Sequence, residues 1–258
     1  MLYIDQFVYT NKMRFFHPGE KLFFSLITMI ICLLINNPFM HLTVIGVMTG
    51  LLVGKARIPG YVLGKILLVP LVFLLLGVIT VALSWNNDGI GMLASVRIGD
   101  YFLGTTKEGL MSAGRIFLRA LSSVTCLIFL AFTVPMIDMI YVLKLLKVPS
   151  LIIEMMLLIY RFIFVFVETA FHIYTAQSSR WGYSGFKRSV YSFGMLFANL
   201  WGKVYFKTRF LMESLLSRGY EGEIRVLYAT PKFSGKNIFF FVTIDLALIV
   251  IALALPVY

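Results

Sequence analysis

The sequence alternates long apolar runs with shorter polar segments along most of its length. Five of the runs predict membrane-embedded helices, at about 18–35, 39–54, 66–84, 112–134 and 237–257. A bilayer admits helices because each helix satisfies its own backbone hydrogen bonds. The pattern therefore predicts an all-α, polytopic helical membrane protein.

The first two runs are short for independent spans. At about 1.5 Å per residue each reaches roughly 24–27 Å, which is near the lower limit for crossing a bilayer. Asn36, Asn37 and Pro38 separate the two runs with residues that form turns and stop helices. The sequence therefore favours a tight helical hairpin over two separate spans.

The region 135–236 is less apolar and carries more charge than the spans. Its pattern predicts a short amphipathic helix at about 135–148 and two long helices at about 150–180 and 185–216. We interpret it as a cytoplasmic helical platform beside the membrane. The chain then divides into 1–134, 135–236 and 237–258.

Three charged residues of the first long helix argue against its being a lipid-exposed span. Glu154, Arg161 and Glu168 recur every seven residues and so share one face. Catalytic carboxylates would need a nucleophile or a metal partner at a fitting spacing, and none accompanies them. We interpret them as an ion-pair stripe that fixes helix packing.

Composition excludes several classes of protein. The 258 residues are 60% hydrophobic and 14% charged, with a mean hydropathy of +0.90, whereas soluble domains average about 25% charged residues. An ordinary soluble enzyme, a disordered chain and a disulfide scaffold do not fit. The net charge of +11 indicates a basic membrane face rather than a nucleic-acid site.

The distribution of Lys and Arg predicts the orientation. The N-terminal segment and the loop between the second and third runs are rich in these residues. Cytoplasmic loops carry such an excess. With five spans, the N-terminus lies in the cytoplasm and Tyr258 lies outside.

Two segments of the platform echo each other. Arg180 is followed by Gly182 and Tyr183, and Arg218 by Gly219 and Tyr220, each at the end of a predicted helix. Glycine and arginine are also favourable at ordinary helix C-termini. The duplication instead favours docking of another protein, because a guanidinium binds acidic groups bidentately.

Pieces along nearly the whole chain resemble the transmembrane T component of energy-coupling-factor (ECF) transporters, in its cobalt/nickel branch, CbiQ. The pieces that carry the resemblance are Tyr9-Thr-Asn11, His17-Pro-Gly-Glu-Lys21, Leu76-Gly-Val-Ile-Thr80, Val96 to Gly104, Tyr160-Arg-Phe-Ile-Phe164, Gln177 to Tyr183 and Arg218 to Arg225. The coupling motif of this family is Ala-Arg-Gly, present twice. Its counterparts here are Ser179, Arg180 and Gly182, with Trp181 inserted, and Ser217, Arg218 and Gly219.

The resemblance implies a non-catalytic subunit of an ATP-driven importer for cobalt or nickel in a prokaryotic inner or plasma membrane. The two motifs would dock two ABC-type ATPase subunits, which bind ATP and magnesium. The chain would move a membrane substrate-binding S component, and a small accessory membrane subunit is a further expected partner. The chain itself has no phosphate-binding GxxxxGK[ST] loop, so no cofactor is expected on it.

Three charged residues lie inside the apolar runs and could form an ion pair. Arg115 and Arg119 lie on one face of the fourth run, and Asp245 lies inside the fifth. Intramembrane charges tend to pair or to face protein. We expect Asp245 to pair with Arg119; the alternative is that the arginines reach outward and Asp245 faces a polar side chain or a partner.

The candidate metal ligands are few. His17, His41, His172, Cys32 and Cys126 are the only histidines and cysteines, and Cys32 and His41 flank the same turn. Two ligands do not make a site, so no metal site is predicted. The rival function is a self-sufficient permease or channel with a regulatory domain, which would place polar residues at mid-bilayer.

Overall fold

The computed structural model describes residues 3–86, 92–98, 101–220 and 233–254. The chain forms two compact units. We call Leu2–Pro135 with Thr230–Tyr258 the core unit, and Met136–Ala229 the arm unit. Each is described by itself.

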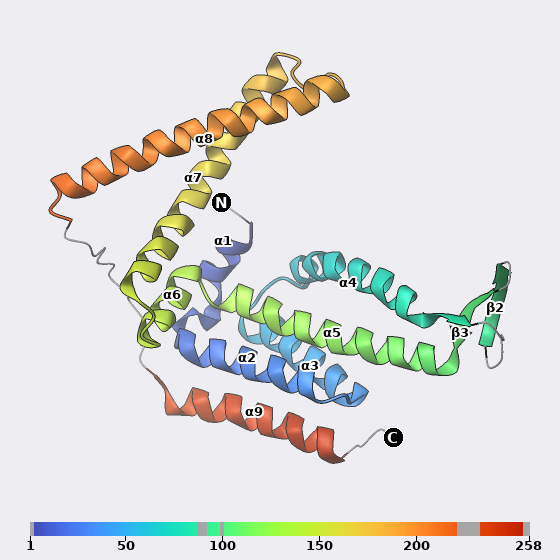
Figure 1. The fold of residues 1–258 in the computed structure, drawn as a ribbon. Helices are drawn as coiled ribbons and strands as arrows, with labels where there is room; N and C mark the ends of the chain where they lie inside the picture. The colour runs from blue at the N-terminus through green and yellow to red at the C-terminus, as the bar shows by residue number, and fades with distance from the viewer. Residues whose placement is uncertain (1–2, 87–91, 99–100, 221–232, 255–258) are drawn as a thin grey trace. The chain divides into compact units, whose positions relative to one another are not determined.

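The core unit is a bundle of helices around α5 (Figure 1). Helix α5 packs against α2, α3 and α4, and α9 packs against α2 and α3. The bounds of its elements are α1 Tyr3–Thr10, the 3-10 turn η1 Lys12–Phe15, α2 Pro18–Leu34, α3 Pro38–Gly50, the π turn η2 Leu51–Lys55, α4 Gly60–Ala82, α5 Lys107–Thr133 and α9 Gly235–Ala254.

Side-chain caps set where three of these helices begin. His17 accepts a hydrogen bond from Gly19 N before α2, and Asn37 accepts one from Phe39 N before α3. In both helices proline follows the cap, at the position where its missing N–H costs nothing. Thr106 caps α5 by accepting from Gly109 N. The turn expected at residues 36–38 thus separates α2 from α3.

Polar contacts tie α2 to α5 inside the core unit. The Lys21 side chain is 0% exposed, and its Nζ donates to the carbonyls of Met13 at 3.1 Å and Thr133 at 2.6 Å. Ser25 Oγ donates to the carbonyl of Cys126 at 2.7 Å. Phe24 stacks on Phe241 of α9 with ring centroids 4.6 Å apart. Polar contacts thus join α2 to α5, and aromatic stacking joins α2 to α9.

A three-stranded antiparallel sheet follows α4, which sequence analysis did not predict. Its strands are β1 Leu83–Asn86, β2 Met92–Ile98 and β3 Tyr101–Thr106, in the order β1-β3-β2. The register pairs Leu83 with Thr105 and Ile98 with Tyr101. The third apolar run, expected to be helical to residue 84, therefore leaves the helix at Ala82. The all-α class is otherwise confirmed.

Five helices of the described residues are long and apolar enough to cross a membrane, judged by length and composition. They are α3 with η2 (Pro38–Lys55), α4, α5, α7 (Ser150–Ser179) and α9. The number agrees with the sequence analysis, but the set differs. Helix α2, which was predicted to be a span, has 17 residues, about 25 Å at 1.5 Å per residue, and is not among the five. Helix α7, which was predicted to lie in the cytoplasm, is among them.

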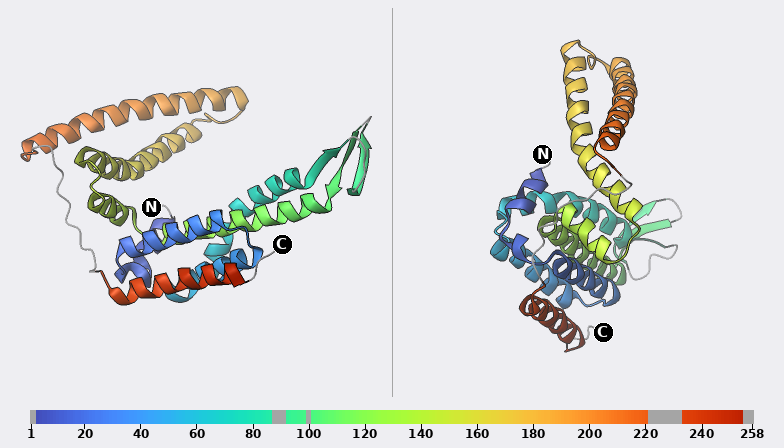
Figure 2. Two further views of the ribbon diagram at one scale, coloured as in Figure 1. Left: turned by 60° about the horizontal axis from the view of Figure 1, so that its bottom comes forward. Right: turned by 90° about the vertical axis from the view of Figure 1, so that its left-hand side faces the viewer.

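The arm unit consists of α6 Met136–Leu145, α7 Ser150–Ser179 and α8 Phe186–Ser217. Helices α7 and α8 cross and pack against each other (Figures 1 and 2). Only Ile153 and Glu154 of α7, and Ser192 and Leu196 of α8, are buried. Most of both helices is therefore open to partners or lipid.

Candidate functional site: the ends of two long helices

The C-terminal end of α7, which we call the first end, closes in a Schellman motif. Ser179 is the last helical residue, and Arg180 is the cap with φ −100° and ψ 21°. Trp181 follows with φ 58°. The Trp181 N–H bonds to the carbonyl of Ser178 at 3.0 Å and the Gly182 N–H to that of Gln177 at 2.9 Å. These two bonds satisfy carbonyls that the helix leaves unpaired.

The C-terminal end of α8, the second end, has the same geometry. Arg218 is the cap after Ser217, with φ −97° and ψ 10°, and Gly219 has φ 77°. The Gly219 N–H bonds to Leu216 O at 3.1 Å and the Tyr220 N–H to Leu215 O at 3.1 Å. Arg180 and Arg218 thus hold equivalent positions on two helix ends.

The equivalence changes the alignment of the two motifs. The left-handed residue is Trp181 at the first end and Gly219 at the second. The sequence analysis aligned Gly182 with Gly219. By the hydrogen bonds at the two ends, Gly182 instead corresponds to Tyr220. A left-handed conformation costs a residue with a Cβ about 1–2 kcal/mol, and glycine adopts it without this penalty.

Close approach explains the glycine at position 182. A Cβ there would lie 2.8 Å from the carbonyl oxygen of Gln177 and 2.8 Å from Ser192 Oγ. Both distances are below any normal contact, and one of the atoms belongs to the backbone. Gly182 lets the loop return tightly over the end of α7.

A set of hydrogen bonds holds the first end in place. Gln177 Nε2 donates to the carbonyl of Ser192 at 3.0 Å, and Tyr183 Oη donates to Gln177 Oε1 at 2.8 Å. Ser192 Oγ donates to the carbonyl of Gly182 at 2.8 Å. The network joins the end of α7 to the second turn of α8, so the exposed residues between them are presented in one conformation.

One long-range contact holds the second end. Tyr220 Oη donates to Glu154 Oε2 at 2.8 Å, which joins the end of α8 to the start of α7. Glu154 is 8% exposed. The hydrogen bond to Glu154, with some loss of hydration, raises the pKa of Tyr220. Each end is therefore fixed by its own tyrosine.

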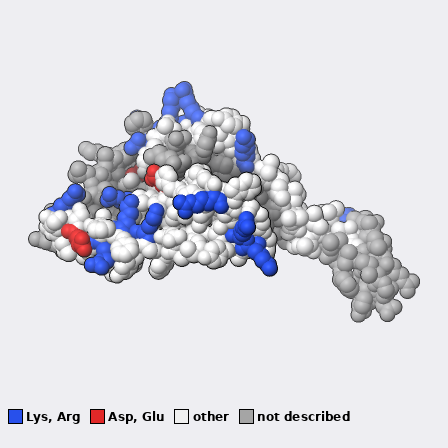
Figure 3. Space-filling model, turned by 90° about the horizontal axis from the view of Figure 1, so that it is seen from above, with Lys and Arg blue, Asp and Glu red and all other residues white. Residues whose placement is uncertain are grey.

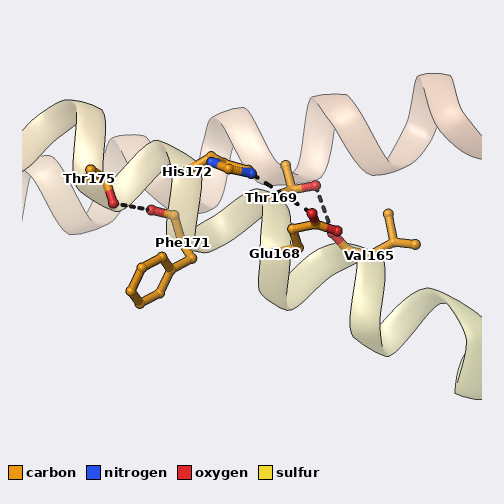
Figure 4. Close-up of polar contacts among 6 residues, drawn as sticks. All are labelled: Val165, Glu168, Thr169, Phe171, His172 and Thr175. Atoms are coloured by element: carbon orange, nitrogen blue, oxygen red, sulfur yellow. Dashed lines mark hydrogen bonds and ion pairs between the residues drawn. The ribbon is translucent and has the colours of Figure 1, made fainter. Parts of the chain in front are cut away.

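Among the residues of the arm unit that the structure describes, no ion pair joins Glu154, Arg161 and Glu168 of the expected stripe to one another. Glu154 faces Tyr220, and Arg161 is exposed. Glu168 Oε1 lies 4.0 Å from His172 Nε2, on the exposed side of α7 (Figure 4). Glu168–His172 and Arg209–Glu213 are the ion pairs among the described residues. Exposed pairs of this kind contribute little to stability.

Both arginines are exposed, and basic side chains lie near Arg180 and along α8. A hollow of about 250 Å³ beside Arg180 is lined by residues that include His172, Asn199 and Lys203. Helix α8 adds the exposed side chains of Lys187, Arg188, Lys207 and Arg209. Blue Lys and Arg groups outnumber red acidic ones on the face drawn in Figure 3. Such a surface attracts acidic groups of a partner.

The charged residues of the core unit do not pair as expected. Thr28 Oγ1 donates to Asp245 Oδ1 at 2.8 Å, and Asp245 is 8% exposed. Arg115 and Arg119 are half-buried on α5, and no ion pair among the described residues includes them. Asp245 faces a polar side chain because α9 packs against α2. Hydropathy could not show which helices are neighbours, so Thr28 was missed.

No cluster of three or more His, Cys, Asp or Glu residues suited to a metal ion is found in the part of the chain that the structure describes. His41 is buried, and its Nδ1 lies 3.0 Å from Ser122 Oγ. Cys32 and Cys126 are buried free thiols.

Comparison of the sequence with known proteins places the chain in a family. Residues 10–228 match the family model of CbiQ, a cobalt transport protein. An uncharacterized protein of Methanocaldococcus jannaschii is 30% identical over 249 residues, which is 96% of this chain and 92% of the relative. The cobalt transport protein CbiQ of Salmonella typhimurium is 26% identical over 223 residues, 86% of this chain and 99% of the relative.

A third relative has a longer chain. A putative fused cobalt transport protein CbiMQ of Methanocorpusculum labreanum is 31% identical over 219 residues, 85% of this chain and 36% of the relative. The match to the family model runs from the first described helix through both helix ends and covers more than half of the sequence. The chain is a multi-pass membrane protein that belongs to the CbiQ family of cobalt transport proteins.

Proposed function

We propose that this chain is the energy-coupling transmembrane subunit of an ATP-driven ECF importer for a divalent transition-metal ion, cobalt or nickel. The observation that carries the proposal is the equivalence of the two helix ends. Arg180 and Arg218 cap two helices in the same motif, and both are exposed. The 32 residues of α8 separate them by about 48 Å along that helix, which suits two separate partners.

Each arginine binds an acidic group on one of two ABC-type ATPase subunits. ATP and magnesium bind to those subunits, which perform the hydrolysis, and this chain catalyses no reaction. A bidentate guanidinium fixes the orientation of each helix end as well as its position. Closure of the ATPase pair then moves α7 and α8 as levers, because the hydrogen bonds at both ends couple the two helices.

The core unit supplies the membrane scaffold. The S component, which binds the metal, docks in the membrane, and a small accessory subunit joins the complex. The arm unit and the N-terminus face the cytoplasm, and the C-terminus faces outward. The fused relative supports a membrane partner, since its name joins two transport proteins in one chain.

A detergent pull-down tests the proposal. The tagged chain is expressed in its native organism, and Arg180→Glu/Arg218→Glu is compared with the wild type after equal membrane insertion has been shown. Co-purifying ABC-type ATPase subunits are scored by mass spectrometry. The wild type should retain the ATPase and the variant should lose it.

The control is Lys144→Glu/Arg161→Glu, which makes the same change of charge on exposed positions of α6 and α7 away from the caps and from the basic residues of α8. It should retain the ATPase. If the wild type captures no ATPase, or if the cap variant retains it fully, the coupling function is wrong and a self-sufficient permease is the function to test.

A further inference from the structure

The first and second ends differ at the residue directly after the arginine. Trp181 at the first end and Gly219 at the second both adopt the left-handed conformation. Only the glycine does so without steric cost. The first end therefore carries a steric cost at Trp181 that the second end avoids at Gly219.

Packing within the chain does not offset that cost. The Trp181 side chain is 76% exposed, so its indole gains little from burial. The loop geometry does not require it either, because the hydrogen bonds that hold the first end come from Gln177, Tyr183 and Ser192. A large exposed aromatic residue in a fixed loop is the kind of residue that carries binding energy at protein interfaces.

The surroundings of Trp181 are also those of an interface. Arg180 precedes it and is exposed, and Phe186, at the start of α8, is 87% exposed. Since the network over Gly182 already fixes the backbone, little conformational entropy is lost when a partner binds the indole. The second end has glycine at this position and offers no such anchor.

On the basis of the proposed coupling function, we propose that Trp181 is the anchor by which the first end binds its ATPase subunit. The partner offers an apolar pocket for the indole beside an acidic group for Arg180. The second end is bound through Arg218 without an aromatic anchor. The two docking sites are therefore unequal, and the first selects among ATPase surfaces by its pocket.

The test replaces Trp181 with glycine or phenylalanine, so that the effect of the strained backbone can be distinguished from that of the indole side chain. Trp181→Gly keeps the left-handed backbone and removes the indole, so the fold and membrane insertion are unchanged. Affinity of the purified chain in nanodiscs for the isolated ATPase subunits should fall about tenfold or more, the size of effect that truncation of an interface anchor gives. Trp181→Phe keeps an aromatic ring and should retain part of the affinity.

The matched control is Lys147→Gly. Lys147 is another exposed residue with a positive φ, 59°, at the end of a helix of the arm unit, so this variant relieves the same backbone strain at a different place. It should bind the ATPase as the wild type does.

The outcomes distinguish this inference from the function on which it rests. If Trp181→Gly binds as tightly as the wild type while Arg180→Glu/Arg218→Glu does not bind, the anchor is wrong and the coupling function stands. If Trp181→Phe loses as much affinity as Trp181→Gly, an aromatic ring at this position does not hold the partner and the apolar pocket is wrong as proposed. If the wild type does not bind the ATPase at all, the coupling function fails first.

Discussion

The hydroxyl of Tyr220 donates a 2.8 Å hydrogen bond to Glu154 Oε2, although the two residues are 66 positions apart. The contact joins the last residue of the second end to the first turns of α7. It makes the pair of long helices a closed structure, because their other ends are joined through Gln177, Tyr183 and Ser192.

Loss of this contact should loosen the second end alone. Tyr220→Phe removes the donor, so amide hydrogens in the last turn of α8 should exchange faster, while those near Gln177 at the first end keep their protection. Hydrogen exchange read by mass spectrometry measures both. Equal protection at the two ends in the variant would show that the hydrogen bond does not hold α8.

The ionisation of Tyr220 should depend on Glu154. Because the folded-state pKa of Tyr220 is raised, the contribution of the contact to stability is present below the ordinary tyrosine pKa. That contribution is lost as pH rises through the raised pKa. Absorbance titration should show a later-ionising tyrosine in the wild type than in Glu154→Gln. Superimposable titrations would contradict the assignment.

A methyl group at position 182 should destabilise the first end. Gly182→Ala places its Cβ against the carbonyl of Gln177, and overpacking of this kind costs about 1–3 kcal/mol. Thermal unfolding in detergent should show a lower midpoint. Gly194→Ala is the control, because a Cβ there meets nothing within 4 Å and alanine favours the helix. A Gly182→Ala protein as stable as the control would exclude the close approach.

The partner of Asp245 can be tested by exchange of charges. Since Thr28 holds Asp245, the double variant Arg119→Asp/Asp245→Arg should be at least as unstable as each single variant. Thr28→Val should destabilise the protein by about 1–3 kcal/mol, because it leaves a buried carboxylate without its donor. Unfolding midpoints measure both. If the double variant recovers the stability lost in the single variants, Asp245 pairs with Arg119 after all.

Lys21 should be essential for the joint between α2 and α5. Lys21→Met keeps most of the side-chain volume but removes the donor to both carbonyls. The Met13 carbonyl still accepts from the Phe16 N–H, whereas the Thr133 carbonyl loses its 2.6 Å bond to Lys21. Unpaired buried groups cost about 1–3 kcal/mol each, so the yield of folded protein in detergent should fall. Lys12→Met changes an exposed lysine and serves as the control, with no change in yield expected.

Periodicity and hydropathy predict most of the helices. The long helices at 150–179 and 186–217 lie within one residue of their expected bounds, because proline and glycine interrupt the pattern there. The sheet of β1, β2 and β3 was missed, since short strands after a long apolar helix carry little periodic signal. The partner of Asp245 was missed because the order of helices in sequence does not give their neighbours in space.

The candidate site was recognised from a duplicated pattern of arginine, glycine and tyrosine at two helix ends, but the two copies were aligned wrongly. The sequence analysis aligned the two motifs on their glycines, Gly182 and Gly219. The left-handed residue of the first end is instead Trp181. A Schellman cap is defined by which N–H bonds to which carbonyl, and the sequence shows neither. The arginines were nevertheless placed correctly relative to the helices, because each comes directly after the last helical residue.

The discontinuity of the core unit has a consequence for biogenesis. Helix α9 belongs with α2 and α3, yet the whole arm unit is synthesised between them. The N-terminal helices therefore leave the ribosome long before α9. The carboxylate of Glu20 accepts a hydrogen bond from the Ser234 N–H, which is synthesised 214 residues later. During this interval the faces of α2 and α3 that α9 covers are open to chaperones, to lipid and to neighbouring nascent chains. Helix α9, made after the arm unit, completes the packing of helices that were made before it.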